Sequence, residues 1–274
     1  MLTGLDSGTE DHLQHASRCR LCDGEVRLRF STQVLARHAV AYSLCLACGS
    51  LQTEPPYWLK DAYEHNLALL DTGAAQRNLT NLSAAYAVAR LLGLRDILDF
   101  GGGDGLLCRL LRDYGLNCYL EDKYAKASYA LAFTHQDFEK PELLLAFEVL
   151  EHFENPQQEL QRLFQHNPKA LLASTEPYAM QNADWWYLAP ETGQHVFFYS
   201  HAAMRLIAKT WGYDLIRQGY YWLFIQSGAA GRTRKTLAKI LLSRPFLRFL
   251  GAILRLMPTP GVTRDFNSLR SSDR

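Results

Sequence analysis

The fold is decided by residues 96–105, which read Asp96-Ile-Leu-Asp99-Phe-Gly101-Gly-Gly103-Asp-Gly105. The first five residues match a short apolar strand, and the spaced glycines after them allow a tight turn and close approach of a ligand to the backbone. Residues 106–114 have the apolar spacing of a helix, which Gly115 ends. The start of such a helix presents free N–H groups to a ligand. The stretch therefore predicts a strand, a ligand-binding turn and a helix.

The alternation of strands and helices continues to residue 226. Strands separated by helices predict a parallel sheet covered on both faces. Two strands in succession at the end predict a hairpin, so the last strand should run antiparallel. The further strands are expected at 117–121, 143–147, 170–175, 213–218 and 221–226, and the further helices at 123–132, 156–166 and 201–211.

An acidic pair, Glu121-Asp122, ends the second predicted strand about twenty residues after the glycines. A carboxylate there can accept both hydroxyls of a ribose, and we favour Asp122 for this role. The glycine spacing is G-x-G-x-G, which differs from the G-x-G-x-x-G of NAD-binding proteins. With Asp99 two residues upstream, the pattern resembles motif I of class I S-adenosylmethionine (SAM) methyltransferases. An NAD-binding fold and a purely structural turn are the alternatives.

The resemblance extends over residues 78–226, with the family's motifs in order. It implies an α/β, Rossmann-like sheet of seven strands, the last antiparallel, with SAM as cofactor. Residues 136–138 resemble the loop that meets adenine, and 146–153 resemble the F-E-V-L-E-H segment that lines the methionine end. The implied cofactor-binding residues are Asp99, Gly101, Gly103, Gly105, Asp122, Asp137, Phe138, Phe147 and Glu148.

Three side chains in that segment, Glu148, Glu151 and His152, are spaced to share one face of a helical turn. Two carboxylates and an imidazole can bind a divalent metal, as in some relatives that methylate catechols or RNA ends. The alternative is that the segment only shapes the cofactor pocket.

Four cysteines form two C-x2-C pairs, Cys19/Cys22 and Cys45/Cys48, and Gly24 and Gly49 follow closely. Four thiolates in this arrangement suit a structural zinc ion, which predicts a small zinc-ribbon domain over residues 18–54. The alternative is an array of reduced thiols without metal. The other two cysteines, Cys108 and Cys118, are expected in the core.

A cysteine knuckle before a SAM core, followed by Tyr57-Trp58, resembles the N-terminal domain of sugar C-methyltransferases that act on nucleotide-linked deoxysugars. Those enzymes carry a further C-terminal α/β domain, and this sequence ends at residue 274 without one. We therefore expect a sugar, a glycan or a related small metabolite as acceptor, and leave open methylation at oxygen or carbon. The knuckles carry only a modest basic bias, so we do not expect a nucleic-acid partner.

An aromatic segment, residues 176–199, follows the strand predicted at 170–175 and contains Glu191-Thr-Gly193-Gln-His195. Its end resembles the G-Q-H segment of the same group. His195 is a candidate general base, with His152 as its rival. The alternative for His195 is a structural hydrogen bond in the loop.

The net charge of +1 conceals an asymmetry. Residues 1–214 carry eight more acidic than basic side chains, and residues 215–274 carry nine more basic than acidic ones. Residues 232–257 read as basic amphipathic helices. They could contact an anionic membrane surface or fold back on the acidic body. Expected domains are a flexible tail (1–17), the zinc ribbon (18–54), a helical linker (55–93), the SAM core (94–228) and the basic helical tail (229–274).

The composition, 48% hydrophobic and 21% charged, is that of an ordinary globular protein. A polar, acidic start over residues 1–16 argues against a signal peptide and for the cytoplasm, with the tail able to reach the inner membrane face. The sequence carries no sign of a particular oligomeric state. We expect a SAM-dependent methyltransferase of a sugar or small metabolite. The alternatives are a metal-dependent O-methyltransferase of a quinone-type or RNA-end substrate, and a non-catalytic scaffold, which the intact glycine motif disfavours.

Overall fold

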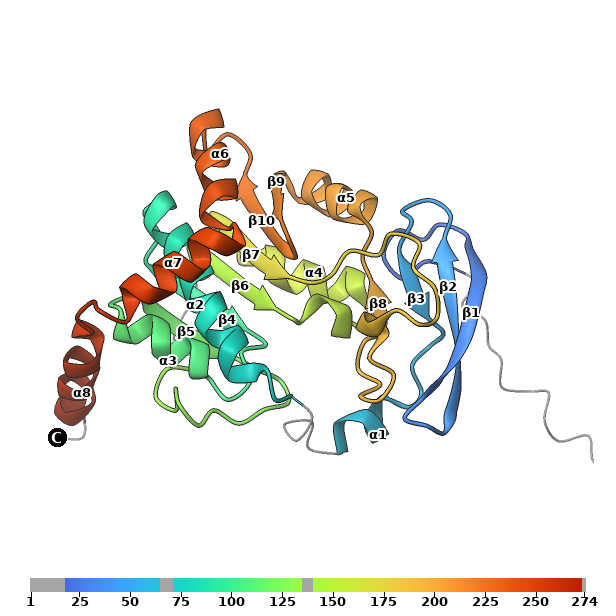
Figure 1. Ribbon diagram of the computed structural model, residues 1–274, viewed down its shortest axis with the longest axis horizontal. Helices are drawn as coiled ribbons and strands as arrows, with labels where there is room; N and C mark the ends of the chain where they lie inside the picture. The colour runs from blue at the N-terminus through green and yellow to red at the C-terminus, as the bar shows by residue number, and fades with distance from the viewer. Residues whose placement is uncertain (1–17, 65–70, 135–139, 273–274) are drawn as a thin grey trace, which may run out of the picture. The chain divides into compact units, whose positions relative to one another are not determined.

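The computed structural model describes residues 18–64, 71–134 and 140–272 (Figure 1). The chain forms two compact units, each assembled from separate segments. The cysteine unit comprises Met1–Leu67, Glu151–Gln157 and Glu176–Ala203. The sheet unit comprises Ala68–Leu150, Gln158–Thr175 and Met204–Arg274.

A mixed sheet with strand order β5-β4-β6-β7-β10-β9 forms the centre of the sheet unit. β5, β4, β6 and β7 are mutually parallel, whereas β10 runs antiparallel to both β7 and β9. This confirms the predicted antiparallel last strand. The strands are β4 (Asp96–Phe100), β5 (Asn117–Glu121), β6 (Leu143–Phe147), β7 (Ala170–Ser174), β9 (Tyr213–Gln218) and β10 (Tyr221–Gln226).

The described residues of this sheet supply six strands, so the expected seventh is not confirmed. A single parallel bridge joins Leu120 of β5 to Thr134, and residues 135–139, which follow it, lie outside the described part of the chain.

The helix expected over residues 123–132 is wrong, because the chain there makes turns. In a helix, the N–H groups of Ser128 and Tyr129 would donate within their own segment. Both donate instead to the carbonyl of Asp104, at 2.8 and 3.0 Å. This segment therefore braces the glycine turn.

Helices cover both faces of the sheet (Figure 1). On one face, apolar side chains of α2, α3, α6 and α7 form a buried cluster with the strands, and α8 packs against α3. On the other face, Phe164 of α4 stacks on Trp211 of α5 at 5.2 Å and meets Phe224 of β10. The helices are α2 (Ala74–Leu92), α3 (Leu106–Asp113), α4 (Pro156–Gln165), α5 (His201–Trp211), α6 (Arg232–Leu241), α7 (Arg244–Leu254) and α8 (Pro260–Ser272).

The basic tail folds back on the sheet unit. The buried carboxylate of Asp265 in α8 accepts bonds from Arg112 Nε and Nη2 at 2.7 and 3.0 Å, and from Arg109 Nη2 at 2.8 Å. A bidentate guanidinium–carboxylate pair of this kind fixes orientation as well as charge. In the part of the chain that the structure describes, no helix is both long enough and apolar enough to cross a membrane.

A four-stranded antiparallel sheet with order β1-β2-β3-β8 forms the cysteine unit. Its core includes the buried aromatic side chains Trp58, Tyr187 and Phe198. Trp58 Nε1 donates to the carbonyl of Gly193 at 2.8 Å, which ties the aromatic segment to the strands. The elements are β1 (Val26–Val34), β2 (His38–Cys45), β3 (Leu51–Thr53), β8 (Phe197–Phe198), α1 (Leu59–Glu64) and two 3-10 helices, Leu150–His152 and Trp186–Leu188.

Candidate functional site

The glycine turn that follows β4 uses left-handed backbone conformations that glycine adopts with least strain. Gly101, Gly103 and Gly105 have φ values of +69°, +61° and +85°. A Cβ on Gly101 would lie 2.6 Å from a methyl group of Val149, whereas a Cβ on Gly103 would have no neighbour within 4 Å. The turn is therefore packed below Gly101 and open beside Gly103, as a ligand cradle requires.

Asp122, the predicted ribose-binding acid, is bonded to the turn itself. Its Oδ2 accepts the N–H of Gly103 at 2.9 Å, and its Oδ1 accepts the N–H groups of Tyr124 and Ala125 at 2.8 and 2.7 Å. The neighbouring Glu121 is bonded differently, with its Oε1 accepting from Arg162 at 3.0 Å. The two acids therefore contact the glycine turn differently: Asp122 accepts the N–H of Gly103 with its side-chain carboxylate, whereas Glu121 accepts the N–H of Gly101 with its backbone carbonyl at 2.7 Å.

Asp99 lies beneath the turn and is 2% exposed. Burial, and then the charge of Asp122, raises the pKa of Asp99 to about 7. A Cβ on Gly102 would overlap Asp99 Oδ2, so the second glycine of the triplet is required for packing against this carboxyl group.

Phe147 and Glu148 lie at the carboxyl end of β6, which is the edge where open α/β sheets bind ligands. Phe147 packs edge-on against Tyr221 at 6.0 Å. Ser174 Oγ, at the end of β7, donates to Glu148 Oε1 at 2.6 Å and accepts the N–H of Glu148 at 3.1 Å. The sequence analysis did not single out Ser174, because only the pairing of β6 with β7 brings it to Glu148.

The helical face expected for Glu148, Glu151 and His152 is wrong. Glu148 has a φ of +53°, so it is left-handed and outside any helix, and only the short 3-10 turn Leu150–His152 follows. The grouping that the cysteine unit does form is Glu151, His152 and His195, whose candidate ligand atoms all lie within 4.8 Å of one another. In this cluster, His195 takes the place that was expected for Glu148. His195 lies 43 residues after His152 in the chain.

Hydrogen bonds orient this Glu151–His152–His195 cluster. Tyr187 Oη donates to Glu151 Oε1 at 2.7 Å, and His195 Nδ1 lies 2.7 Å from the carbonyl oxygen of Tyr187. Burial, and then the charge of His195, lowers the pKa of His152 to about 3. His152 is therefore neutral at physiological pH. Tyr187 belongs to the aromatic segment expected at 176–199, but its bond to Glu151 depends on tertiary contacts that the sequence does not reveal.

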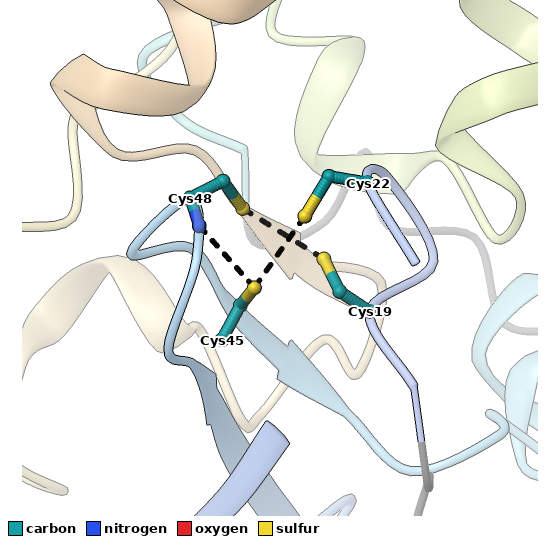
Figure 2. A group of neighbouring side chains, drawn as sticks. All are labelled: Cys19, Cys22, Cys45 and Cys48. Carbon is teal, nitrogen blue, oxygen red and sulfur yellow. Dashed lines mark hydrogen bonds between the residues drawn. The ribbon is translucent and has the colours of Figure 1, made fainter. Parts of the chain in front are cut away.

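The four cysteines meet at one point of the cysteine unit (Figure 2). The sulfur atoms of Cys19 and Cys48 are 3.7 Å apart, and those of Cys22 and Cys45 are 3.5 Å apart. Ligand sulfurs around tetrahedral zinc are about 3.8 Å apart, given Zn–S bonds of ~2.3 Å. A Cβ on Gly24 would press on two of the sulfurs at 3.3 Å and on Ala47 at 2.7 Å. The donor set and its spacing therefore fit a zinc ion.

Arg20, within the first cysteine pair, connects the knuckle to the aromatic segment. Its guanidinium donates to the carbonyls of Val196, Glu154 and Thr53 at 2.6, 3.0 and 3.2 Å. Burial lowers the pKa of Arg20 to about 10. Arg20 thus links the first cysteine pair to Val196, the residue after His195. Its guanidinium is hydrogen-bonded to backbone carbonyls of the protein itself.

Two predicted cofactor-binding residues, Asp137 and Phe138, lie outside the described residues. The other predicted cofactor residues belong to the sheet unit, and the predicted bases and zinc ligands belong to the cysteine unit.

A mixed α/β sheet with a glycine turn after β4 and an acid after β5 defines the methyltransferase class of fold. The chain belongs to the methyltransferase domain family, whose model matches residues 63–218, and it is a SAM-dependent methyltransferase. No curated protein matches the sequence.

Several solved structures resemble the fold at low sequence identity. The methyltransferase domain of bacterial CtHen1-C is 16% identical, with 54% of this chain and 98% of that chain covered and a TM-score of 0.40. Magnesium protoporphyrin IX methyltransferase from Synechocystis PCC 6803, solved with SAH, is 20% identical, with 63% and 96% covered and a TM-score of 0.43. The mitomycin 7-O-methyltransferase MmcR is 17% identical, with 58% of each chain covered and a TM-score of 0.41. The substrates in the names of these enzymes describe those enzymes and not this chain.

Proposed function

We propose that the protein methylates a sugar, a glycan or a related small metabolite, with His195 as the general base. The observation that carries this is the imidazole of His195, whose Nδ1 is hydrogen-bonded to a backbone carbonyl. A carbonyl only accepts, so Nδ1 carries the hydrogen and Nε2 has the lone pair of a base. Trp186, the first residue of the 3-10 helix Trp186–Leu188, is 71% exposed. An exposed indole face is suited to stacking on a sugar ring.

Bound SAM supplies an electrophilic methyl group whose bond to sulfur breaks with the electron pair passing to sulfur. The acceptor hydroxyl forms the new O–CH3 bond, or an acidified carbon forms the new C–CH3 bond, and its proton passes to His195 Nε2. Holding the two reactants in line provides much of the acceleration in such a displacement. We assign the cofactor-holding role to Asp99, Gly101, Gly103, Gly105, Asp122, Phe147 and Glu148.

Transfer of labelled methyl groups from SAM to a panel of acceptors tests this proposal. The panel contains free and nucleotide-linked sugars, catechols and quinols, and short RNAs. We expect methylation among the sugars, and a Trp186→Ala variant with a raised KM for that acceptor and unchanged SAM affinity by calorimetry. Methylation of catechols or RNA alone would contradict the acceptor assignment.

We also propose that Cys19, Cys22, Cys45 and Cys48 hold one structural zinc ion. Hydrogen bonding from the Cys19 thiol lowers the pKa of Cys48 to about 5, and thiolate is the form that binds zinc. Mass spectrometry of the metal content should find one zinc per chain in the wild type and none in Cys45→Ser. The matched Cys108→Ala variant, with its change in the core, should keep the zinc. Zinc-free wild-type protein purified without chelator would refute the site.

A second candidate, metal-dependent O-methylation, is favoured by the Glu151–His152–His195 cluster. A carboxylate and two neutral imidazoles can hold a divalent cation, and the bond from His195 Nδ1 to a carbonyl is the support that metal-binding histidines commonly have. Activity that disappears with a chelator and returns with Mg²⁺ or Mn²⁺, in protein whose zinc is retained, would establish this function. Full activity in the chelator would exclude it.

A further inference from the structure

A cavity of about 750 Å³ lies within the sheet unit, lined by α2, α7 and the turn that joins β9 to β10. α7 lies along α2 (Figure 1), close enough that a Cβ on Gly251 would come within 3.2 Å of the Ser83 hydroxyl. The cavity reaches Tyr220 and Tyr221 near the turn and extends toward Tyr114 at the end of α3.

The lining is basic and carries no counter-charge. Arg244, Arg248 and Arg255 line the cavity, and none of the described lining residues is acidic. Among residues 18–64, 71–134 and 140–272, no carboxylate lies within ion-pair distance of Arg244 or Arg248. Both arginines lie in the first turns of α7, where the helix dipole also favours an anion. Two guanidinium groups in this setting suit phosphoryl oxygens, which arginine binds in a bidentate manner.

The same cavity borders the end of the sheet at which the cofactor residues lie. Tyr221 pairs in register with Ser174, whose hydroxyl donates to Glu148. The Tyr221 ring also packs on Phe147, and its hydroxyl donates to Asn81 of α2 at 2.8 Å. A molecule in the cavity that reaches Tyr221 would therefore contact a side chain that packs on Phe147.

Resting on the acceptor class proposed above, we propose that this cavity binds a phosphate-bearing acceptor, with Arg244 and Arg248 on the phosphoryl oxygens and Tyr220 beside the remainder. Two kinds of acceptor carry such a phosphoryl group. One source is a soluble sugar phosphate or diphosphate, and the second is a lipid-linked sugar phosphate. The second source is compatible with α7 and the turn after it, where Phe249, Ile253 and Leu256 are exposed at 61%, 38% and 87%.

Binding of two probes tests the proposal and separates the sources. Inorganic pyrophosphate is titrated into the full chain by calorimetry, and sedimentation measures recruitment to phosphatidylcholine vesicles with or without phosphatidylglycerol. The test variant is Arg244→Gln/Arg248→Gln. The matched control is Arg232→Gln/Arg234→Gln, which removes the same charge from exposed positions of α6 outside the cavity. Melting temperature and SAM affinity confirm that all the proteins are folded.

We expect a loss of binding of about ten-fold or more in the cavity variant and little change in the control. If the cavity variant alone loses binding to pyrophosphate, the phosphoryl group belongs to a soluble acceptor. If the cavity variant alone loses binding to phosphatidylglycerol vesicles, it belongs to a lipid-linked acceptor. Equal losses in both variants, or no binding of either probe to the wild type, would overturn the proposal. Because neither probe needs an identified acceptor, rejection of sugars in the methylation panel would leave this result standing.

Discussion

His195 Nδ1 lies 2.7 Å from the backbone carbonyl oxygen of Tyr187, eight residues earlier in the chain. This bond fixes the tautomer of the neutral ring, since the carbonyl accepts and Nδ1 must donate. Tyr187 also donates through its hydroxyl to Glu151. One residue therefore orients two members of the Glu151–His152–His195 cluster, and the tautomer that it fixes leaves the basic lone pair of His195 on Nε2.

Replacing His195 by Gln should lower kcat by about 100- to 10,000-fold, the usual contribution of a general base, with SAM affinity unchanged by calorimetry. In the wild type, activity should fall on the acidic side as the imidazole becomes protonated, and the residual activity of the variant should lack this decline. His38→Gln is the matched control, because His38 contacts Asp61 instead. A variant that keeps the wild-type pH profile would show that His195 is not the base.

Substitutions of the two acids at the end of β5, Glu121 and Asp122, should have unequal effects on SAM affinity. Asp122→Ala removes an acceptor of three backbone N–H groups, including that of Gly103. We expect the turn to open and SAM to bind about 10- to 150-fold more weakly, which corresponds to the roughly 1.5–3 kcal/mol of a charged hydrogen bond. Glu121→Gln replaces the carboxylate that accepts from Arg162 but keeps the backbone carbonyl that accepts from Gly101, so it should change SAM affinity little. Equal losses in calorimetry would refute the assignment.

The glycine turn and its strand could be predicted because they depend on local geometry. Positive φ values at Gly101, Gly103 and Gly105 leave few other residues to choose from, and the choice of Asp122 over Glu121 follows from one residue of spacing. The cysteine pairs were equally informative, since each C-x2-C knuckle is a local structure.

Contacts between residues far apart in the chain could not be predicted from the sequence. His195 joins Glu151 and His152 because of the hydrogen bonds of Tyr187 and Trp58, not because of any spacing. The helix expected over residues 123–132 failed because Asp104 captures two of its N–H groups. Local spacing therefore predicted the glycine turn, while the Glu151–His152–His195 cluster and the cavity lined by α2 and α7 depend on tertiary structure.

Asp99 should make stability depend on pH in an unusual direction. Its folded pKa of about 7 lies above the ordinary 3.8, so between pH 4 and 7 the folded state keeps a proton that the unfolded state has lost. The free energy of unfolding then falls as pH rises, by ~1.4 kcal/mol per pH unit from this group. Asp99→Asn removes this titration. Denaturant melts should show the variant gaining stability relative to the wild type from pH 4 to 7, and parallel curves would contradict the prediction.

Arg20→Gln should weaken both the cysteine unit and catalysis. The substitution removes the charged donors to the carbonyls of Val196, Glu154 and Thr53, and a hydrogen bond from a charged group contributes about 1.5–3 kcal/mol. We expect a lower melting temperature and a lower kcat, since Val196 is bonded next to His195, while zinc content and SAM affinity stay unchanged. Arg27→Gln, at an exposed position of β1, is the control. Equal kcat values for the two variants would show that the knuckle does not position His195.

Asp265→Asn should loosen the tail from the sheet unit. Burial raises the pKa of Asp265, but bonds from Arg112, Arg109 and Arg264 outweigh it and lower that pKa to about 2. The pair therefore stabilises the fold above about pH 4, and this contribution is lost as pH falls from 4 toward 2. At neutral pH the variant leaves the buried Arg112 without its counter-charge, which costs about 3–5 kcal/mol. Asp71→Asn, whose partner Arg77 is half exposed, should cost less than about 1 kcal/mol. Denaturant melts measure both, and limited proteolysis should release α8 first in the Asp265 variant. If the two variants unfolded alike, the buried pair would not be what anchors the tail.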